Sequence, residues 1–120
     1  MRPIQCLALA SLLVGCASPD VERIVTRELA VPVGGAVSDI AVIVPRGRAI
    51  AFVAQPMNGD ETLKEDIDLQ PFDPTICSVW DLQEKNQFVV IGLNEGVTDM
   101  EIIDEAGLAA PVLLRVQVTP

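Results

Sequence analysis

The sequence predicts an all-β fold, and three observations lead to that prediction. Gly, Pro, Asn and Asp gather into turn-forming clusters at short intervals, from residues 32–35 to residues 105–107. Between the clusters lie short runs rich in Val and Ile that alternate apolar with polar residues, as a strand with one buried face does. No segment repeats apolar residues at helical spacing, and eight of the nine prolines follow residue 16. Strands and turns that recur every ~8–12 residues are typical of a β-sandwich, here of about seven short strands.

The strands are expected in the following order. The first lies at residues 24–25 or 29–33, and the next two, residues 40–44 and 50–54, flank a Pro-Arg-Gly turn. Residues 88–91 are a continuous apolar run, which is expected of a strand buried on both faces. The last two strands alternate within residues 100–102 and 112–118. The side chains predicted to face the core are Ile40, Val42, Val44, Ile50, Phe52, Ala54, Met100, Ile102, Val112, Leu114, Val116 and Val118.

The chain has only four aromatic residues, so its core depends on aliphatic packing. Phe52, Trp80 and Phe88 are the expected large core side chains, and binding is the alternative role for each. Phe72 is the aromatic most suited to binding, because it lies in a Pro-Phe-Asp-Pro loop.

Residues 1–15 have the features of an export signal. Arg2 precedes an apolar stretch of 11 residues, 4–14, which is too short to span a membrane as a helix of about 20 residues. The stretch ends in Leu13-Val14-Gly15-Cys16, which resembles the lipobox of bacterial lipoproteins. The resemblance implies cleavage between Gly15 and Cys16, a diacylglycerol on the Cys16 sulfur and an acyl chain on the new amino terminus. The alternative is an ordinary signal peptide followed by a chance cysteine.

Two or three acyl chains would anchor the protein stably, whereas one chain binds a membrane only marginally. Ala17 follows Cys16, and this resembles lipoproteins sorted to the outer membrane, since an Asp there favours inner-membrane retention in enteric bacteria. We therefore expect an outer-membrane protein that faces the periplasm.

This interpretation divides the chain into a signal peptide (1–15), a lipidated Cys with a polar tether (16–27) and one sandwich domain (28–120). Loss of Arg2 leaves seven Lys and Arg against 17 Asp and Glu, a formal charge of −10. Cys6 leaves with the signal and Cys16 carries lipid, so Cys77 has no partner for an intramolecular disulfide. We expect Cys77 to be a small buried apolar residue, with an intermolecular disulfide or redox role as the alternative.

Several function classes are excluded or disfavoured by composition. The absence of His removes His-dependent catalytic triads and His-ligated zinc sites. The acidic charge leaves no basic patch for nucleic acid, and no Gly-rich loop opens a helix as a phosphate site requires. The sequence therefore predicts no enzyme, no small-molecule substrate and no cofactor beyond the covalent lipid.

The densest charge run spans residues 60–68. A solvated acidic loop is the first interpretation, and a Ca²⁺ site is the second, although the EF-hand spacing is missing. The candidate ligands are Asp60, Glu61, Glu65, Asp66 and Asp68. A second acidic group is expected on the solvent face of a strand and its turn: Asp99, Glu101, Asp104 and Glu105.

Two stretches resemble known β-domains. Residues 40–54 read Ile-x-Val-x-Val-Pro-x-Gly-x-x-Ile-x-Phe-x-Ala, and an Asp-Pro-Thr-Ile-Cys-x-Val element at 73–79 precedes an apolar strand and Gly96-x-Thr98-x-Met100-x-Ile102. This progression resembles bacterial Ig-like domains of the intimin-associated type. The Gly-x-x-x-Gly-x-Thr turn at 92–98 also resembles the N-terminal β-domain of secretins. Leu69 stands where Ig-like repeats often have Trp, and residues 55–68 form a longer connection.

The sequence thus predicts a membrane-anchored, non-catalytic module that acts structurally or binds another envelope protein. One alternative is an accessory lipoprotein of a pilus or secretion system that contains a secretin. A further alternative is a Ca²⁺-dependent binding module that uses the acidic run at 60–68.

Overall fold

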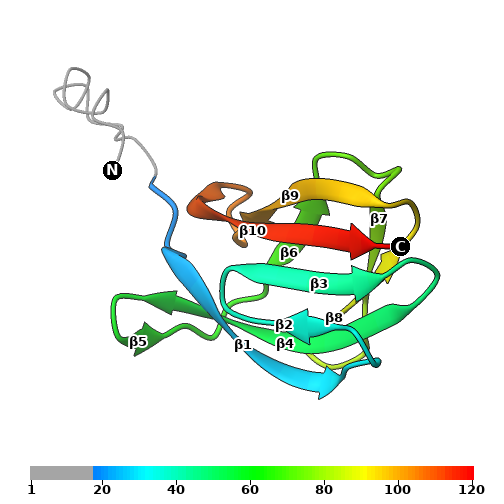
Figure 1. The fold of residues 1–120 in the computed structure, drawn as a ribbon. Coiled ribbons are helices and arrows are strands. Elements are labelled where there is room, and N and C mark those ends of the chain that lie inside the picture. The colour runs from blue at the N-terminus through cyan, green and yellow to red at the C-terminus, as the bar shows by residue number, and fades with distance from the viewer. Residues whose placement is uncertain (1–17) are drawn as a thin grey trace, which may run out of the picture.

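The computed structural model describes residues 18–120, which form ten strands in two facing sheets (Figure 1). The predicted signal peptide, the cleavage site at Gly15 and Cys16, and the lipidation site Cys16 lie outside the described residues. The β4 sheet contains β1 (Arg23–Ala30), β4 (Ala49–Asn58), β5 (Glu61–Thr62), β7 (Cys77–Asp81) and β8 (Gln87–Gly92). The β10 sheet contains β2 (Ala36–Val37), β3 (Ala41–Pro45), β6 (Asp68–Pro71), β9 (Gly96–Ile103) and β10 (Ala109–Thr119).

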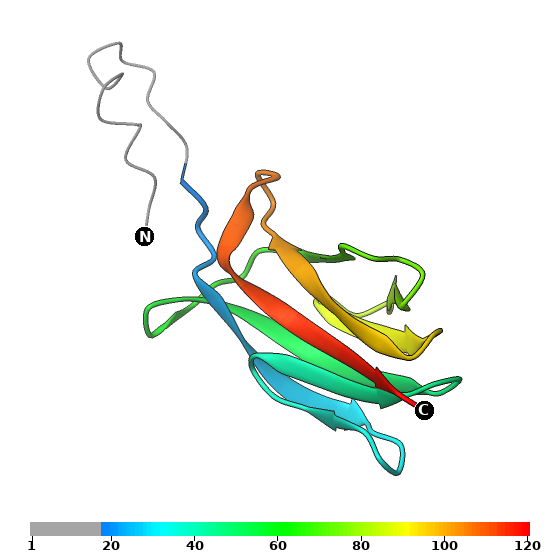
Figure 2. The same cartoon turned by 45° about the horizontal axis from the view of Figure 1, so that its top comes forward.

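The predicted all-β sandwich is confirmed, with more strands than the seven expected. The strand order is β1-β4-β8-β7 in one sheet, with β5 paired to β4, and β2-β3-β10-β9-β6 in the other. Strands β2 and β5 have two residues each and β6 has four. Strands this short do not show an alternation of apolar and polar residues that could be recognised in the sequence. Strand β10 pairs parallel with β3, whereas its pairing with β9 is antiparallel. Figure 2 shows β10 and β9 side by side.

The sandwich starts earlier than the boundary at residue 28 that the sequence indicates. Strand β1 begins at Arg23, and both Val21 and Ile24 are buried. Ile24 is opposite Pro56 of β4, so this first strand is part of the sheet. The sequence offers residues 24–25 as one of two places for the first strand, because an apolar pair shows too little alternation to decide, and the structure has one strand over Arg23–Ala30.

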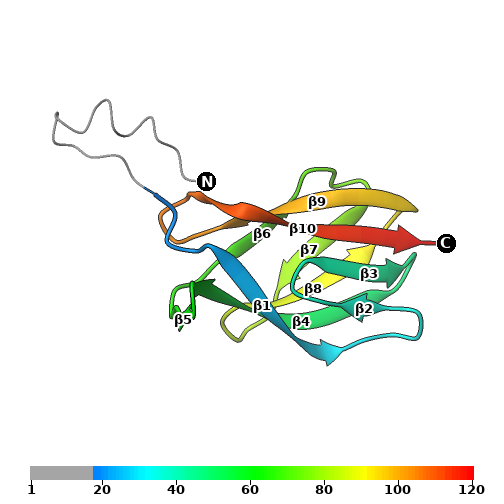
Figure 3. The same cartoon turned by 60° about the vertical axis from the view of Figure 1, so that its left-hand side comes forward.

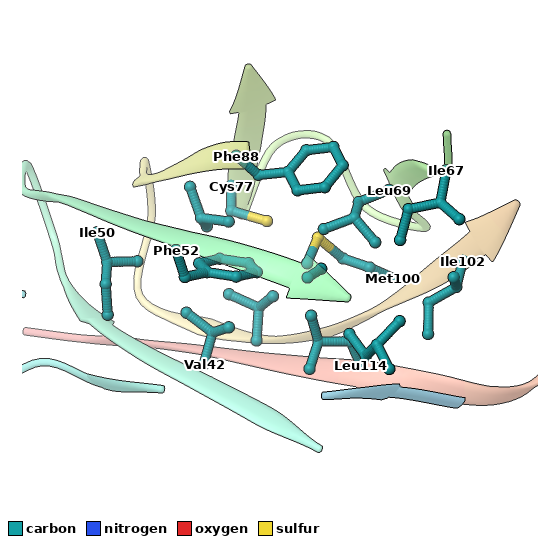
Figure 4. Packing of buried hydrophobic residues seen from close by; sticks show 14 of the residues in the cluster. Val42, Ile50, Phe52, Ile67, Leu69, Cys77, Phe88, Met100, Ile102 and Leu114 are labelled. Atoms are coloured by element: carbon teal, nitrogen blue, oxygen red, sulfur yellow. The ribbon is translucent and has the colours of Figure 1, made fainter. Parts of the chain in front are cut away.

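The core lies between the two sheets and rests on aliphatic packing around one aromatic pair (Figure 4). The rings of Phe52 and Phe88 have centroids 6.3 Å apart and are tilted by 41°. Such pairs add to the stabilisation that comes from burying both side chains. Of the core residues predicted by alternation, those buried are Val42, Val44, Ile50, Phe52, Ala54, Met100, Ile102, Leu114, Val116 and Val118.

Two of the predicted core residues are exposed instead. Ile40 precedes β3 in a bend, where it has left the alternation of the strand. Val112 lies where the register between β10 and β9 shifts, between Ala109 and Leu113. A bulge or irregularity in a strand turns the local side chains toward the other face. A prediction that assumes strict alternation through such a point therefore places these side chains on the wrong face of the sheet.

The prediction that Trp80 fills the core is wrong. Trp80 is 62% exposed. Side chains alternate along a strand, and Cys77 and Val79 are the residues of β7 that face the core, so Trp80 between Val79 and Asp81 faces outward. The prediction that residues 88–91 are buried on both faces is also wrong. Phe88 and Val90 are buried, whereas Val89 and Ile91 are only half-buried.

Glycines close the end of the sandwich where β3 and β8 meet. A Cβ on Gly92 would lie 2.9 Å from the Pro45 carbonyl oxygen, so a side chain there would push the two strands apart. Gly96 has φ 153° and begins β9, which agrees with the predicted glycine turn before Thr98.

Candidate functional site

The chain enters the sandwich at a junction built around Asp104, in the turn between β9 and β10. Asp104 is 5% exposed, and its Oδ2 accepts a hydrogen bond from the Asp20 amide at 3.1 Å. Its Oδ1 accepts hydrogen bonds from the amides of Ala106 and Leu108, both at 2.9 Å. A carboxylate that accepts three backbone N–H groups holds both its own turn and the incoming chain. The expectation that Asp104 lies on a solvent face is therefore wrong.

The tip of the β4–β5 hairpin also binds residues 20–23, the segment that leads into β1. Asn58 donates from Nδ2 to the carbonyl of Asp20 at 2.8 Å. The Gly59 amide donates to Glu22 Oε1, and Arg23 donates to the Gly59 carbonyl, both at 2.8 Å. Residues 20–23 are thereby fastened at one end of the sandwich, while the C-terminus lies at the other end (Figure 3). Any segment that precedes Asp20 leaves the domain from this end.

Asn86 fastens the acidic segment to the turn between β7 and β8. Its Oδ1 accepts from the Ile67 amide and its Nδ2 donates to the Glu65 carbonyl, both at 2.9 Å. Asn86 also has a φ of 58°, a left-handed conformation that Asn adopts more readily than most residues. This role of Asn86 is not predictable from the sequence, in which it is one Asn of a polar turn.

The structure does not bring the five Ca²⁺ candidates together. Asp60 lies in the β4–β5 turn and Glu61 on β5, while Asp68 begins β6. Glu65 instead accepts a hydrogen bond from the Glu105 amide at 3.3 Å, and the side chain of Glu105 accepts one from the Asp66 amide at 2.8 Å. Across residues 18–120, no three His, Cys, Asp or Glu side chains are grouped so that they could hold a metal ion.

A hollow of about 290 Å³ separates the acidic segment from the β7–β8 turn. Asp66, Asp81 and Glu84 are among its lining residues. Burial raises the pKa of Asp81, and the charges of Asp68 and Asp66 raise it further. The potential in the hollow is therefore negative, which disfavours anionic ligands.

The exposed aromatic Phe72 stands on a loop whose backbone is fixed to β9. The Phe72 amide donates to the Asp99 carbonyl at 2.9 Å, and the Asp73 amide donates to Thr98 Oγ1 at 3.0 Å. The hydroxyl and then the amide of Thr75 donate to Asp73, and these hydrogen bonds lower the pKa of its carboxyl. Phe72 is 58% exposed, which agrees with the loop position expected from sequence.

Cys77 is fully buried, as the sequence predicts for a small apolar residue. Burial raises the pKa of its thiol from 9.0 to about 11, and the charge of Asp73 contributes in the same direction. We therefore expect no reaction with a thiol reagent at about pH 8 until the protein unfolds, because the thiolate is the nucleophile. The measurement is the labelling rate with and without urea, and fast labelling of the folded protein would contradict the prediction.

The same pKa shift makes stability depend on pH. As the pH rises, the thiol of the unfolded chain ionises first, near 9.0, while that of the folded chain stays protonated up to about 11. The unfolded state then binds fewer protons, so the free energy of unfolding falls over this interval. The Cys77→Ala variant should lack this part of the alkaline loss, which urea titrations at several pH values would measure.

No family model matches the chain, and no curated protein matches it by sequence. Among solved structures it is similar to domains 4 and 5 of the S-layer protein SbsC, with a TM-score of 0.51 and 15% identity, covering 79% of this chain and 54% of that one. It is also similar to domains 5–6 of SbsC, with a TM-score of 0.52 and 17% identity, covering 80% of this chain and 45% of that one. The chain thus spans about half the length of these structures. At these identities the likeness shows that the fold is shared.

Proposed function

We propose that this protein is a lipid-anchored, non-catalytic module of the bacterial cell envelope that acts structurally or binds another envelope protein. The observation that carries the proposal is Leu13-Val14-Gly15-Cys16, which lies just before the sandwich, whose first buried residue among residues 18–120 is Val21. Its proposed place is the periplasmic face of the outer membrane, supported by Ala17 after the lipidated Cys.

The short distance along the chain between Cys16 and the domain adds a geometric argument. Asp20 is already held by Asp104 and Asn58, so only residues 17–19 lie between the lipidated Cys and the first fixed residue. An extended chain spans at most about 3.6 Å per residue, so this link would reach roughly 14 Å. The domain would therefore stay close to the membrane, and its partner would lie close to the membrane as well.

The similar structures support a structural role. Both are domains of an S-layer protein, so this fold occurs as a module of a surface layer. Within residues 18–120 we find no helix of the length and apolarity that crossing a bilayer requires.

The anchor is tested by replacing the two cysteines of the leader one at a time in a bacterial host. Cys16→Ser should abolish incorporation of labelled palmitate and leave an unprocessed precursor, because the acyl chains need the Cys16 sulfur and amine. Cys6→Ser, in the same apolar stretch, should be labelled and processed like the wild type. Palmitate labelling and electrophoretic mobility of the membrane fraction are the measurements.

The proposal fails if Cys16→Ser is labelled and fractionates with membranes like the wild type. It also fails if the wild-type protein carries no palmitate and is found in the soluble periplasmic fraction. In the first case the anchor lies elsewhere, and in the second case residues 1–15 act as an ordinary signal peptide.

A further inference from the structure

The outer face of the β4 sheet carries no carboxylate on its four long strands. A residue that is paired across strands with a buried residue points toward the core, and its two neighbours along the strand point outward. The acidic residues of these strands point the other way, because Glu28 is opposite Phe52 and Asp81 is opposite Phe88. This is notable in a chain with 17 acidic residues. The apolar part of the face consists of Ala49, Ala51, Val53, Trp80, Val89 and Ile91.

The outer face of the β10 sheet is different. Thr98 and Met100 are buried, so Asp99 and Glu101 point outward from β9. Asp99 accepts a hydrogen bond from Arg115 of β10 at 3.2 Å, and both side chains are on the surface. Two copies that met through this face would bury Asp99, Glu101 and Arg115, and charged groups that lose water on contact cost free energy.

The β4 sheet presents a large side chain and a small one in the same cross-strand row. Trp80 of β7 is opposite Val89 of β8, and Val89 is opposite Ala51 of β4. Neighbouring strands are about 4.8 Å apart, so Trp80 and Ala51 are separated by roughly 10 Å. Rotation by a half-turn about an axis along β8, in the plane of contact, places Trp80 over Ala51 of the second copy. Val89 then meets Val89 of the second copy, and the face is complementary to itself.

We propose that two copies of this chain pack through the outer face of the β4 sheet, with Trp80 of each over Ala51 of the other. The distribution of charge favours a second copy as the partner, because two strongly acidic molecules can pack through this face without bringing carboxylates together. Arg23 and Arg27 of β1 remain at the rim of the contact. Asp20 is hydrogen-bonded to Asp104, which lies between two strands of the β10 sheet. The inference does not depend on the lipid anchor.

The area of this face determines how tightly we expect the dimer to associate. Four strands span about 15 Å, so the face is smaller than the ~800 Å² per partner of a standard interface. We expect a dissociation constant between about 10 µM and 1 mM for the domain in solution. Added salt should tighten the dimer, because it screens the repulsion between two acidic molecules.

The test uses residues 18–120, which contain the whole core cluster from Val21 to Val118. Sedimentation equilibrium up to about 1 mM should show a monomer–dimer equilibrium. Trp80 is the only Trp, so its fluorescence should shift to shorter wavelength as the dimer forms. Trp80→Asp should weaken association at least about ten-fold, a loss of about 1.4 kcal/mol. Ala51→Glu should weaken it similarly and keeps the fluorescent reporter.

The matched control is Leu113→Asp, which adds a carboxylate at a 45% exposed apolar residue on the outer face of the other sheet. It should leave association unchanged, and thermal melts should show all three variants folded. A wild-type domain that stays monomeric at about 1 mM overturns the proposal, as does an equal loss in Leu113→Asp. Weaker association at higher salt also overturns it. A Trp80 shift produced by phosphatidylglycerol vesicles on the monomer would mean that a lipid surface, and not a second copy, covers this face.

Discussion

Replacing Phe52 with Ala is expected to lower the free energy of unfolding by about 3–5 kcal/mol. Phe52 is fully buried in β4 at the centre of the sandwich, and its ring contacts that of Phe88 from the neighbouring strand. Its removal loses the burial of a large apolar side chain and leaves a cavity between two sheets that cannot close. Small domains have a free energy of unfolding of only about 5–15 kcal/mol, so this loss is a large fraction of the total stability.

Urea titration followed by circular dichroism measures this loss. Phe72→Ala is the matched control, because it removes the same side chain from an exposed loop and should change the free energy of unfolding by less than about 0.5 kcal/mol. Similar losses in the two variants would contradict the packing described for Phe52.

The second large effect is expected for Asp104→Ala, at about 2–3 kcal/mol. The substitution removes the acceptor of three backbone N–H groups at once, those of Asp20, Ala106 and Leu108. Asp104→Asn should cost less, because one carbonyl oxygen remains for the two amides of the turn. Its amide group would then face the Asp20 N–H, so the incoming chain is the part that should loosen.

Urea titration gives the overall loss for both variants, and hydrogen exchange separates the two parts of the junction. In Asp104→Asn the amide of Asp20 should exchange faster, while those of Ala106 and Leu108 keep most of their protection. Asp60→Ala removes an exposed carboxylate from the β4–β5 turn and should change stability by less than about 0.5 kcal/mol. A loss in Asp104→Ala no larger than this control would show that water replaces the carboxylate at no cost.

The junction also links stability to the proposed anchor. Release of Asp20 would leave a longer free segment before β1, since the next residue held by the hairpin tip is Glu22. The reach of a lipidated chain would increase by only a few ångströms per residue released. Asp104 and Asn58 together would therefore set how closely the domain is held to the proposed anchor.

Strand prediction succeeded where a strand has one buried and one solvated face. In the second half of β10, Leu114, Val116 and Val118 are apolar and buried while the residues between them are polar, so the sequence shows the buried face directly. It failed in β7, where Val79 and Trp80 are both apolar and have opposite parity. Only the pairing of β7 with β8 decides between them, because it turns Cys77 and Val79 toward the core.

The polar residues that organise the candidate site were the hardest to predict. Asp104 was assigned to a solvent face, although it holds Asp20, which is 84 residues away in the sequence. Asn86 holds Glu65 and Ile67 across a gap of about 20 residues. The acidic run at 60–68 stands out in the sequence because its charges are adjacent, but the structure distributes them over the β4–β5 turn, β5, the irregular connection that follows and the start of β6.

It follows from the sequence alone that the chain is all-β, that most of its core is aliphatic and that its N-terminal apolar stretch ends in a motif that resembles a lipobox. These properties are local, since each follows from residues within one strand, one turn or one short motif. Only the tertiary structure decided which face Trp80 occupies, which carboxylate is buried and where the incoming chain is held. Each of these depends on pairing between segments far apart in the sequence, and no local pattern records that pairing.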